Sequence, residues 1–169
     1  MNPPAPGLRI VLDTNVWLDW LVFDDPRVRP ILTAAGEGQV RLFLDAPCAD
    51  ELMRALGYAF RGKRLALGDR QDLFTRCRNR AQWWETGVGG AGMELPACRD
   101  PDDQKFLQLS LSCDAHALVT RDRALLDLDR RRALRPRFRV LTPLQATRMI
   151  EDARPTCGDA AINFSRCHA

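Results

Sequence analysis

Two acidic residues follow apolar runs that are typical of buried strands. Asp13 comes directly after residues 8–12, "LRIVL", and Asp122 follows residues 116–120, "HALVT", with Arg121 between. A single Asp after a strand is common, because Asp also serves as a turn residue or a helix cap. Two such acids at the carboxyl ends of neighbouring parallel strands would lie side by side. The pair therefore indicates a polar site at one edge of a sheet.

Two further acids stand at the starts of predicted helices. Asp103 belongs to the group "DPDD", and Phe106 and Leu107 follow it by three and four residues. Helical spacing puts these three side chains on one face, so Asp103 is expected to point toward the sheet. Asp100 is expected to cap the same helix. Glu51 lies in the first turns of the helix after residues 40–44, where an exposed helix-start acid remains an equal alternative.

A group of carboxylates of this kind is typical of a site that binds a hard cation. Four like charges at one place repel one another, so either their pKa values rise or cations bind between them. Oxygen ligands without Cys or His favour Mg²⁺ or Mn²⁺, and sites of this kind serve phosphate chemistry. The six cysteines form no Cys-x-x-Cys pair and only two histidines occur, which argues against zinc. We interpret the cysteines as reduced and mostly structural.

Strands and helices alternate along the chain, which positions these acids. Apolar runs predict strands at 8–12, 40–44, 116–120 and 137–141. Helical patterns and capping signals predict helices over 15–23, 26–36, 48–60, 62–85, 101–113, 124–134 and 143–153, with Asp45 as a cap. The alternation predicts an α/β fold, a three-layer α/β/α sandwich with a mostly parallel four- or five-stranded sheet. We expect one domain over 8–153 and a tail over 154–169.

Bulk composition agrees with a single globular domain. The 169 residues are 46% hydrophobic and 28% charged, and no apolar stretch is long enough to cross a bilayer. The first residues, "MNPPAPG", lack the basic start and apolar core of a secretory signal, so a cytoplasmic protein is expected. The net charge is +3, and only Lys63 and Lys105 among the 25 basic residues are lysines. A GC-rich genome explains much of this arginine content.

The order of these motifs resembles the PIN-domain family of nucleases, in particular its bacterial branch of type II toxin–antitoxin toxins. The matching pieces are "VLDTNVWL", "ADELMRAL", "RDPDDQKFLQLSLSCDAHALVTRDRALL" and "RVLTPLQ". The resemblance implies a parallel α/β fold, a Mg²⁺ or Mn²⁺ pocket and cleavage of single-stranded RNA to 5′-phosphate and 3′-hydroxyl ends. It also implies a homodimer and a cognate antitoxin. By position, it assigns the metal and catalytic roles to Asp13, Glu51, Asp103 and Asp122, and supporting polar roles to Asn15 and Thr120.

Two positions depart from the family pattern. Gln104 and Ala124 stand where members of this branch often carry further acids, which bears on whether a second metal ion binds. None of the four core carboxylates is missing.

An acidic pocket repels RNA, so basic residues are expected around it. The candidates are Arg121 and Arg123, which flank Asp122, and Arg61 and Arg64, which follow the helix of Glu51. Trp83 and Trp84 are candidates for stacking on bases, with packing in a core or a dimer interface as the alternative.

Three other functions fit parts of the pattern. A haloacid-dehalogenase-like phosphatase also opens with a strand and an Asp, but it needs an acid where Asn15 stands and a lysine that is absent here. A catalytically silent PIN-like module that binds RNA or a protein, and a housekeeping RNA-processing nuclease, both remain alternatives.

Overall fold

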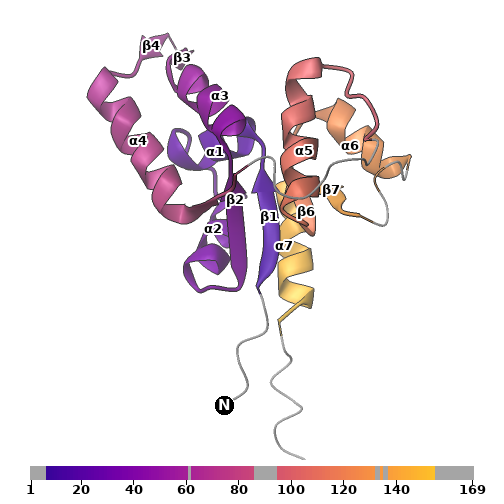
Figure 1. Cartoon of the computed structure of the whole chain (residues 1–169). Helices are drawn as coiled ribbons and strands as arrows, with labels where there is room; N and C mark the ends of the chain where they lie inside the picture. The colour runs from indigo at the N-terminus through magenta and orange to yellow at the C-terminus, as the bar shows by residue number, and fades with distance from the viewer. Residues whose placement is uncertain (1–6, 61, 86–94, 132–133, 135–136, 155–169) are drawn as a thin grey trace, which may run out of the picture.

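The computed structural model describes residues 7–60, 62–85, 95–131, 134 and 137–154 (Figure 1). Its strands are β1 (Leu8–Leu12), β2 (Val40–Leu44), β3 (Ala59–Phe60), β4 (Lys63–Arg64), β5 (Ala81–Trp83), β6 (Ala117–Val119) and β7 (Arg139–Leu141). Its α-helices are α1 (Thr14–Leu21), α2 (Arg29–Gly36), α3 (Ala46–Leu56), α4 (Leu67–Arg80), α5 (Gln104–Ser112), α6 (Arg123–Arg130) and α7 (Pro143–Asp152), and a 3₁₀ turn, Pro101–Asp103, precedes α5.

Five strands form one parallel sheet in the order β5-β2-β1-β6-β7. Consecutive residues of the central strands are buried, for example Ile10, Val11 and Leu12 in β1. Because successive side chains of a strand point to opposite faces, helices must cover both faces of the sheet. The predicted three-layer α/β/α fold with a parallel five-stranded sheet is confirmed.

The strand order reverses beside β1, and this positions the candidate site. The chain moves outward from β1 to β2 and β5, then returns through α5 to pair β6 with the free side of β1. Leu12 is in register with Val119, so the residues after these two strands leave the sheet at the same level. Figure 1 shows α3 and α5 on either side of this end of the sheet.

Buried apolar side chains hold α1 and α5 against the sheet. Trp17, Phe106 and Leu107 are almost fully buried, as the helical spacing of "NVWLDWL" and "KFLQLSL" predicts. The predicted caps are confirmed: the carboxylate of Asp45 accepts from the backbone N–H of Cys48, and that of Asp100 accepts from Asp102. The acids of interest are therefore carried by elements with well-packed anchors.

Two predictions about local structure are wrong. Residues 57–60 do not continue α3, because the helix ends at Leu56 and residues 59–60 form β3, which pairs with β4. Residues 81–83 are not helical but form β5, the edge strand that pairs with residues 42–44 of β2. The helix predicted over 62–85 also begins later than expected, because residues 63–64 form β4 and α4 begins at Leu67. The partner of β5 is remote in sequence, so local patterning does not reveal that strand, whereas β3 and β4 are neighbours along the chain.

Several predictions fall partly or wholly outside the described residues. The tail over 154–169 is described only at Arg154, so Cys157 and Cys167 lie outside. The four described cysteines are free, and three of them are buried. Within the described part of the chain, no helix is long and apolar enough to span a bilayer.

Candidate active site

Thr120 joins the two acids that follow β1 and β6. Its hydroxyl donates to Asp13 Oδ2 at 2.6 Å and accepts from the backbone N–H of Asp122 at 2.9 Å. The backbone N–H of Asp13 also donates to the carbonyl of Val119 at 2.9 Å, which continues the pairing of the two strands. Sheet register therefore brings Asp13 and Asp122 to one place, with the fully buried Thr120 between them.

Asp13 is a buried carboxylate without a cationic partner among the described residues. Only 3% of it is exposed. Burial raises its pKa, the hydrogen bond from Thr120 opposes that rise, and repulsion from Glu51 adds to it. Burying an unpaired charge is costly, so the site fits a cation at this carboxylate.

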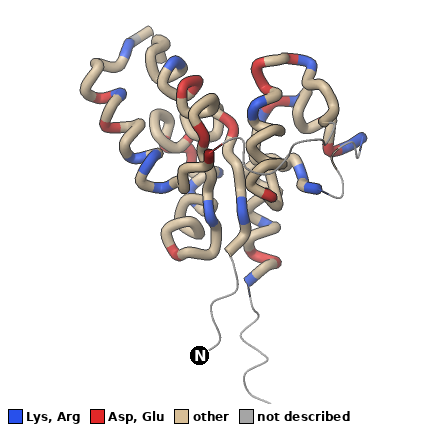
Figure 2. The backbone as a smooth tube through the Cα atoms, viewed as in Figure 1, with Lys and Arg blue, Asp and Glu red and all other residues tan. Residues whose placement is uncertain are grey.

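Asp103 ends the 3₁₀ turn before α5, close enough to the other acids for their charges to act on it. Burial is the main cause that raises its pKa to about 6, and the negative charges of Asp13, Asp122, Asp100 and Glu51 raise it further. The carboxylate of Asp122 accepts from the backbone N–H of Leu125 at 3.0 Å and so caps α6. Figure 2 shows acidic segments in both halves of the molecule near the end of the sheet.

Glu51 has a charged partner that local sequence patterns do not reveal. The ammonium group of Lys105, on α5, forms an ion pair with Glu51 Oε2, on α3. Both side chains are largely buried, with 14% of Lys105 and 24% of Glu51 exposed. The acidic group therefore contains one fixed positive charge.

The chemistry of these side chains fits a hard divalent cation, although their positions do not form a ligand set. Among the described residues, no three Asp, Glu, His or Cys side chains are arranged so that they could hold a metal ion. The donors near Asp13 are carboxylate and hydroxyl oxygens, which are the ligands that Mg²⁺ and Mn²⁺ prefer.

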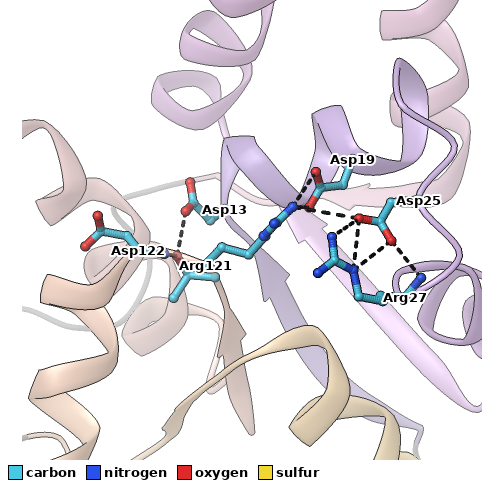
Figure 3. Close-up of polar contacts among 7 residues, drawn as sticks. Asp13, Asp19, Asp25, Arg27, Arg121 and Asp122 are labelled. Atoms are coloured by element: carbon cyan, nitrogen blue, oxygen red, sulfur yellow. Dashed lines mark hydrogen bonds and ion pairs between the residues drawn. The ribbon is translucent and has the colours of Figure 1, made fainter.

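A second polar network begins at Arg121, between Thr120 and Asp122. Arg121 Nη1 donates to both carboxylate oxygens of Asp19, at 2.9 and 2.8 Å, and lies 3.8 Å from Asp25 Oδ2. Asp25 also accepts from Arg27, and that hydrogen bond is the main cause that lowers its pKa to about 2. Figure 3 shows Arg121 extending toward Asp19 and Asp25, away from the carboxylate of Asp122.

The other predicted site residues lie on the surface. Asn15 is exposed at the start of α1, and Arg64 is exposed in β4. Arg123 is exposed on α6, where it lines a cavity of about 470 Å³ together with Arg121, Leu126, Asp127 and Arg130. Arg61 lies outside the described residues.

The two candidate stacking residues differ in exposure. Trp83 is 42% exposed, with the guanidinium of Arg78 4.0 Å from its ring centroid. Trp84 is partly buried and packs edge-to-face on Phe43, with centroids 5.7 Å apart. Packing against the core therefore accounts for Trp84, whereas Trp83 presents its ring at the surface.

Comparison with known proteins identifies the class of fold and then the family. A chain in the crystal structure of VapBC2 from Rickettsia felis bound to a DNA fragment from their promoter superposes with a TM-score of 0.54 at 12% identity, covering 80% of this chain and 98% of that one. No curated protein matches the sequence. The family model described as PIN domain matches residues 9–124, well over half of the chain. This chain belongs to the PIN domain family.

Proposed function

We propose that this chain is a metal-dependent endoribonuclease that hydrolyses phosphodiester bonds of single-stranded RNA. The observation that carries the proposal is the buried carboxylate of Asp13, which has no cationic partner among the described residues and is linked through Thr120 to Asp122. Members of the PIN family are generally nucleases, and the link lies within the matched residues.

Asp13, Asp103 and Asp122 would hold a Mg²⁺ or Mn²⁺ ion, with Glu51 holding or orienting it. Because no three of the described acids surround a common point in this structure, binding of the ion would have to draw these side chains together. Such an ion supplies charge stabilisation at the scissile phosphate and activation of the attacking water. The hydroxyl of Thr120 fixes the orientation of the Asp13 carboxylate, as outer hydrogen bonds do around metal ligands. Asn15 would hydrogen-bond the acids or the attacking water. The products expected from the resemblance carry 5′-phosphate and 3′-hydroxyl ends.

Basic side chains would hold the RNA strand near the acids. Arg123 is exposed next to Asp122, and no ion pair is found for it within the described residues. Arg64, and Arg61 beyond the described residues, would extend this contact along the strand. Arg121 already has Asp19 as a partner, so it would reach RNA only by exchanging that carboxylate for a phosphate.

We further propose that the protein is the toxin of a type II toxin–antitoxin pair, acts in the cytoplasm as a homodimer and binds a cognate antitoxin. The fold it shares with a chain of the Rickettsia felis VapBC2 structure supports this reading. A housekeeping RNA-processing nuclease of the same family is the alternative.

A cleavage assay tests the enzymatic proposal. The purified chain is incubated with end-labelled single-stranded RNA and Mn²⁺ or Mg²⁺, and with EDTA as a blank. Asp13→Asn and Asp122→Asn should each lower the rate at least about 100-fold, whereas Asp152→Asn, an exposed acid at the end of α7, should not. Circular dichroism checks that each variant is folded. Unchanged cleavage by Asp13→Asn removes Asp13 from the mechanism, and metal-independent RNA binding without cleavage supports the silent module.

Growth of a bacterial host separates a toxin from a housekeeping nuclease. Induced expression of the wild-type chain should arrest growth, and Asp13→Asn should not. Co-expression of the small open reading frame beside its gene should restore growth. Normal growth under wild-type expression, with active enzyme in the lysate, contradicts the toxin assignment.

A further inference from the structure

Basic residues occupy neighbouring positions near the amino ends of the central strands. Arg9 of β1 and Arg41 of β2 are partners in the parallel register. In-register neighbours point to the same face, so the two guanidinium groups leave the sheet together from strands about 4.8 Å apart. Figure 2 shows basic segments side by side on these adjacent strands. Arg9 precedes Asp13 by four residues, so it lies about 13 Å along β1 from that acid.

His116, the residue before β6, adds a third donor beside this pair. Its Nδ1 accepts a hydrogen bond from the backbone N–H of Arg9 at 2.9 Å. The neutral ring therefore carries its proton on Nε2 and presents a donor there. Burial lowers the pKa of His116, and the positive charges of Arg9 and Arg41 lower it further, so both guanidinium groups lie near the ring. We call Arg9, Arg41 and His116 the basic row.

The described residues do not neutralise the charges of the basic row. Arg41 Nε is buried and has no hydrogen-bond partner among them. Arg9 Nε donates to the backbone carbonyl of Asp114 at 2.7 Å, rather than to a carboxylate. Within the described part of the chain, no ion pair involves either arginine. Like charges on neighbouring strands repel, and a buried donor without a partner is costly, so an anion at this place would remove both costs.

The donors of the basic row fit a phosphate group better than a carboxylate. A carboxylate has two oxygens, which the fork of a single guanidinium already matches. A tetrahedral phosphate group offers additional oxygens in other directions, so donors from different strands can each bind one. None of the three side chains of the basic row is acidic, so none of them repels such an anion.

We propose that Arg9, Arg41 and His116 bind a phosphate group near the amino end of the sheet, apart from the acids that follow β1 and β6. Free inorganic phosphate and a phosphate of an RNA strand share this chemistry. The site itself does not depend on cleavage of RNA, whereas RNA as the source of the phosphate rests on the proposed function. An RNA strand would then be held at a second place besides the acids.

A nuclear magnetic resonance titration with inorganic phosphate at constant ionic strength tests the site. The imidazole ¹⁵N signals of His116 are followed in the full chain, and His168→Gln assigns the signals of the only other histidine. Wild type should show saturable shifts, which sulfate reproduces and acetate does not. Arg41→Gln should weaken the affinity about 10-fold, as expected for the loss of a charge-assisted hydrogen bond. Arg148→Gln, which removes an exposed positive charge from α7, should bind as wild type does.

A second variant keeps the test decisive if Arg41→Gln is poorly folded. Arg41→Lys retains the charge but loses the guanidinium fork, so it should bind phosphate more weakly than wild type and more tightly than Arg41→Gln. Urea unfolding without phosphate should show Arg41→Gln to be at least as stable as wild type, because one of two neighbouring like charges is removed.

Single-stranded RNA in EDTA distinguishes the two sources of phosphate. If RNA occupies the basic row, a long strand should shift the His116 signals, and Arg41→Gln should lower the slope of log affinity against log salt by about 0.7. Shifts with inorganic phosphate alone assign the site to the free ion. Wild type without saturable shifts in either titration, or folded Arg41→Gln and Arg41→Lys with unchanged affinity, overturns the inference. Saturable phosphate binding by a wild-type chain that does not cleave RNA contradicts the proposed function and leaves the basic row standing.

Discussion

Replacing Asp103 by Asn should stabilise the metal-free protein at neutral pH. The pKa of Asp103 is raised from 3.8 to about 6, chiefly by burial and then by the neighbouring carboxylates. At about 1.36 kcal/mol per pH unit, the difference corresponds to about 3 kcal/mol at most. The carboxyl group is only partly buried, so solvent screening reduces the expected gain to about 1–2 kcal/mol.

The sign of this effect follows from which state binds the proton more tightly. The folded-state pKa of Asp103 lies above the unfolded value, so ionisation at pH 7 disfavours the folded state. Lowering the pH through about 6 toward 3.8 protonates the folded state first and removes this destabilisation. The advantage of Asp103→Asn over wild type should therefore be full at pH 7.5 and disappear near pH 4.

Urea unfolding in EDTA at pH 4, 6 and 7.5 measures the prediction. Asp152→Asn, an exposed acid on α7, serves as the control and should show no such pH-dependent gain. Saturating Mn²⁺ should reverse the order, because wild type gains about 2.7 kcal/mol when the ion is at 100 times its dissociation constant. An Asp103→Asn variant that is no more stable than wild type at pH 7.5 in EDTA would refute the reasoning that burial and the neighbouring carboxylates together disfavour the ionised Asp103.

Three further substitutions probe the contacts around the site. Asp19→Asn removes the carboxylate that accepts twice from Arg121 and should lower the free energy of unfolding by about 1–3 kcal/mol in urea titrations. Thr120→Val removes the hydrogen bond to Asp13 and should slow RNA cleavage about 10- to 100-fold, while Mn²⁺ titration shows weaker binding. Arg123→Gln should weaken RNA binding uniformly across sequences and reduce the slope of log affinity against log salt by about 1, with the rate at saturating RNA unchanged. A slope that stays the same for Arg123→Gln excludes that side chain from phosphate contact.

Residues tied to local periodicity could be predicted from the sequence. Asp13 and Asp122 end apolar runs, and Asp103 shares a helical face with Phe106 and Leu107. The sequence cannot reveal that β6 pairs with β1, but the strand–helix alternation limits the possible sheet topologies. Asp13 and Asp122 then gather at one edge, because the parallel strands before them end at the same side of the sheet.

Side chains whose partners are remote in the chain escaped prediction, although signals for them existed. Asp19 lies in "NVWLDWL", and its buried carboxylate is matched by Arg121, about a hundred residues later. A charged residue within an apolar segment indicates a buried partner, but nothing local names that partner. The edge strand β5 was missed for the same reason, because its pairing partner β2 is remote in sequence.

The choice of lysine at position 105 bears on how the site balances its charge. In a chain with 25 basic residues, only this one and Lys63 are lysines. A guanidinium is planar and directs its donors in a fixed fork, whereas an ammonium is a compact point charge with three donors. At Lys105 those donors meet the Glu51 carboxylate and the Asp102 carbonyl, which lie on different elements. A compact ammonium group can meet oxygens from two elements at once, whereas the fixed fork of a guanidinium would match only one of them well.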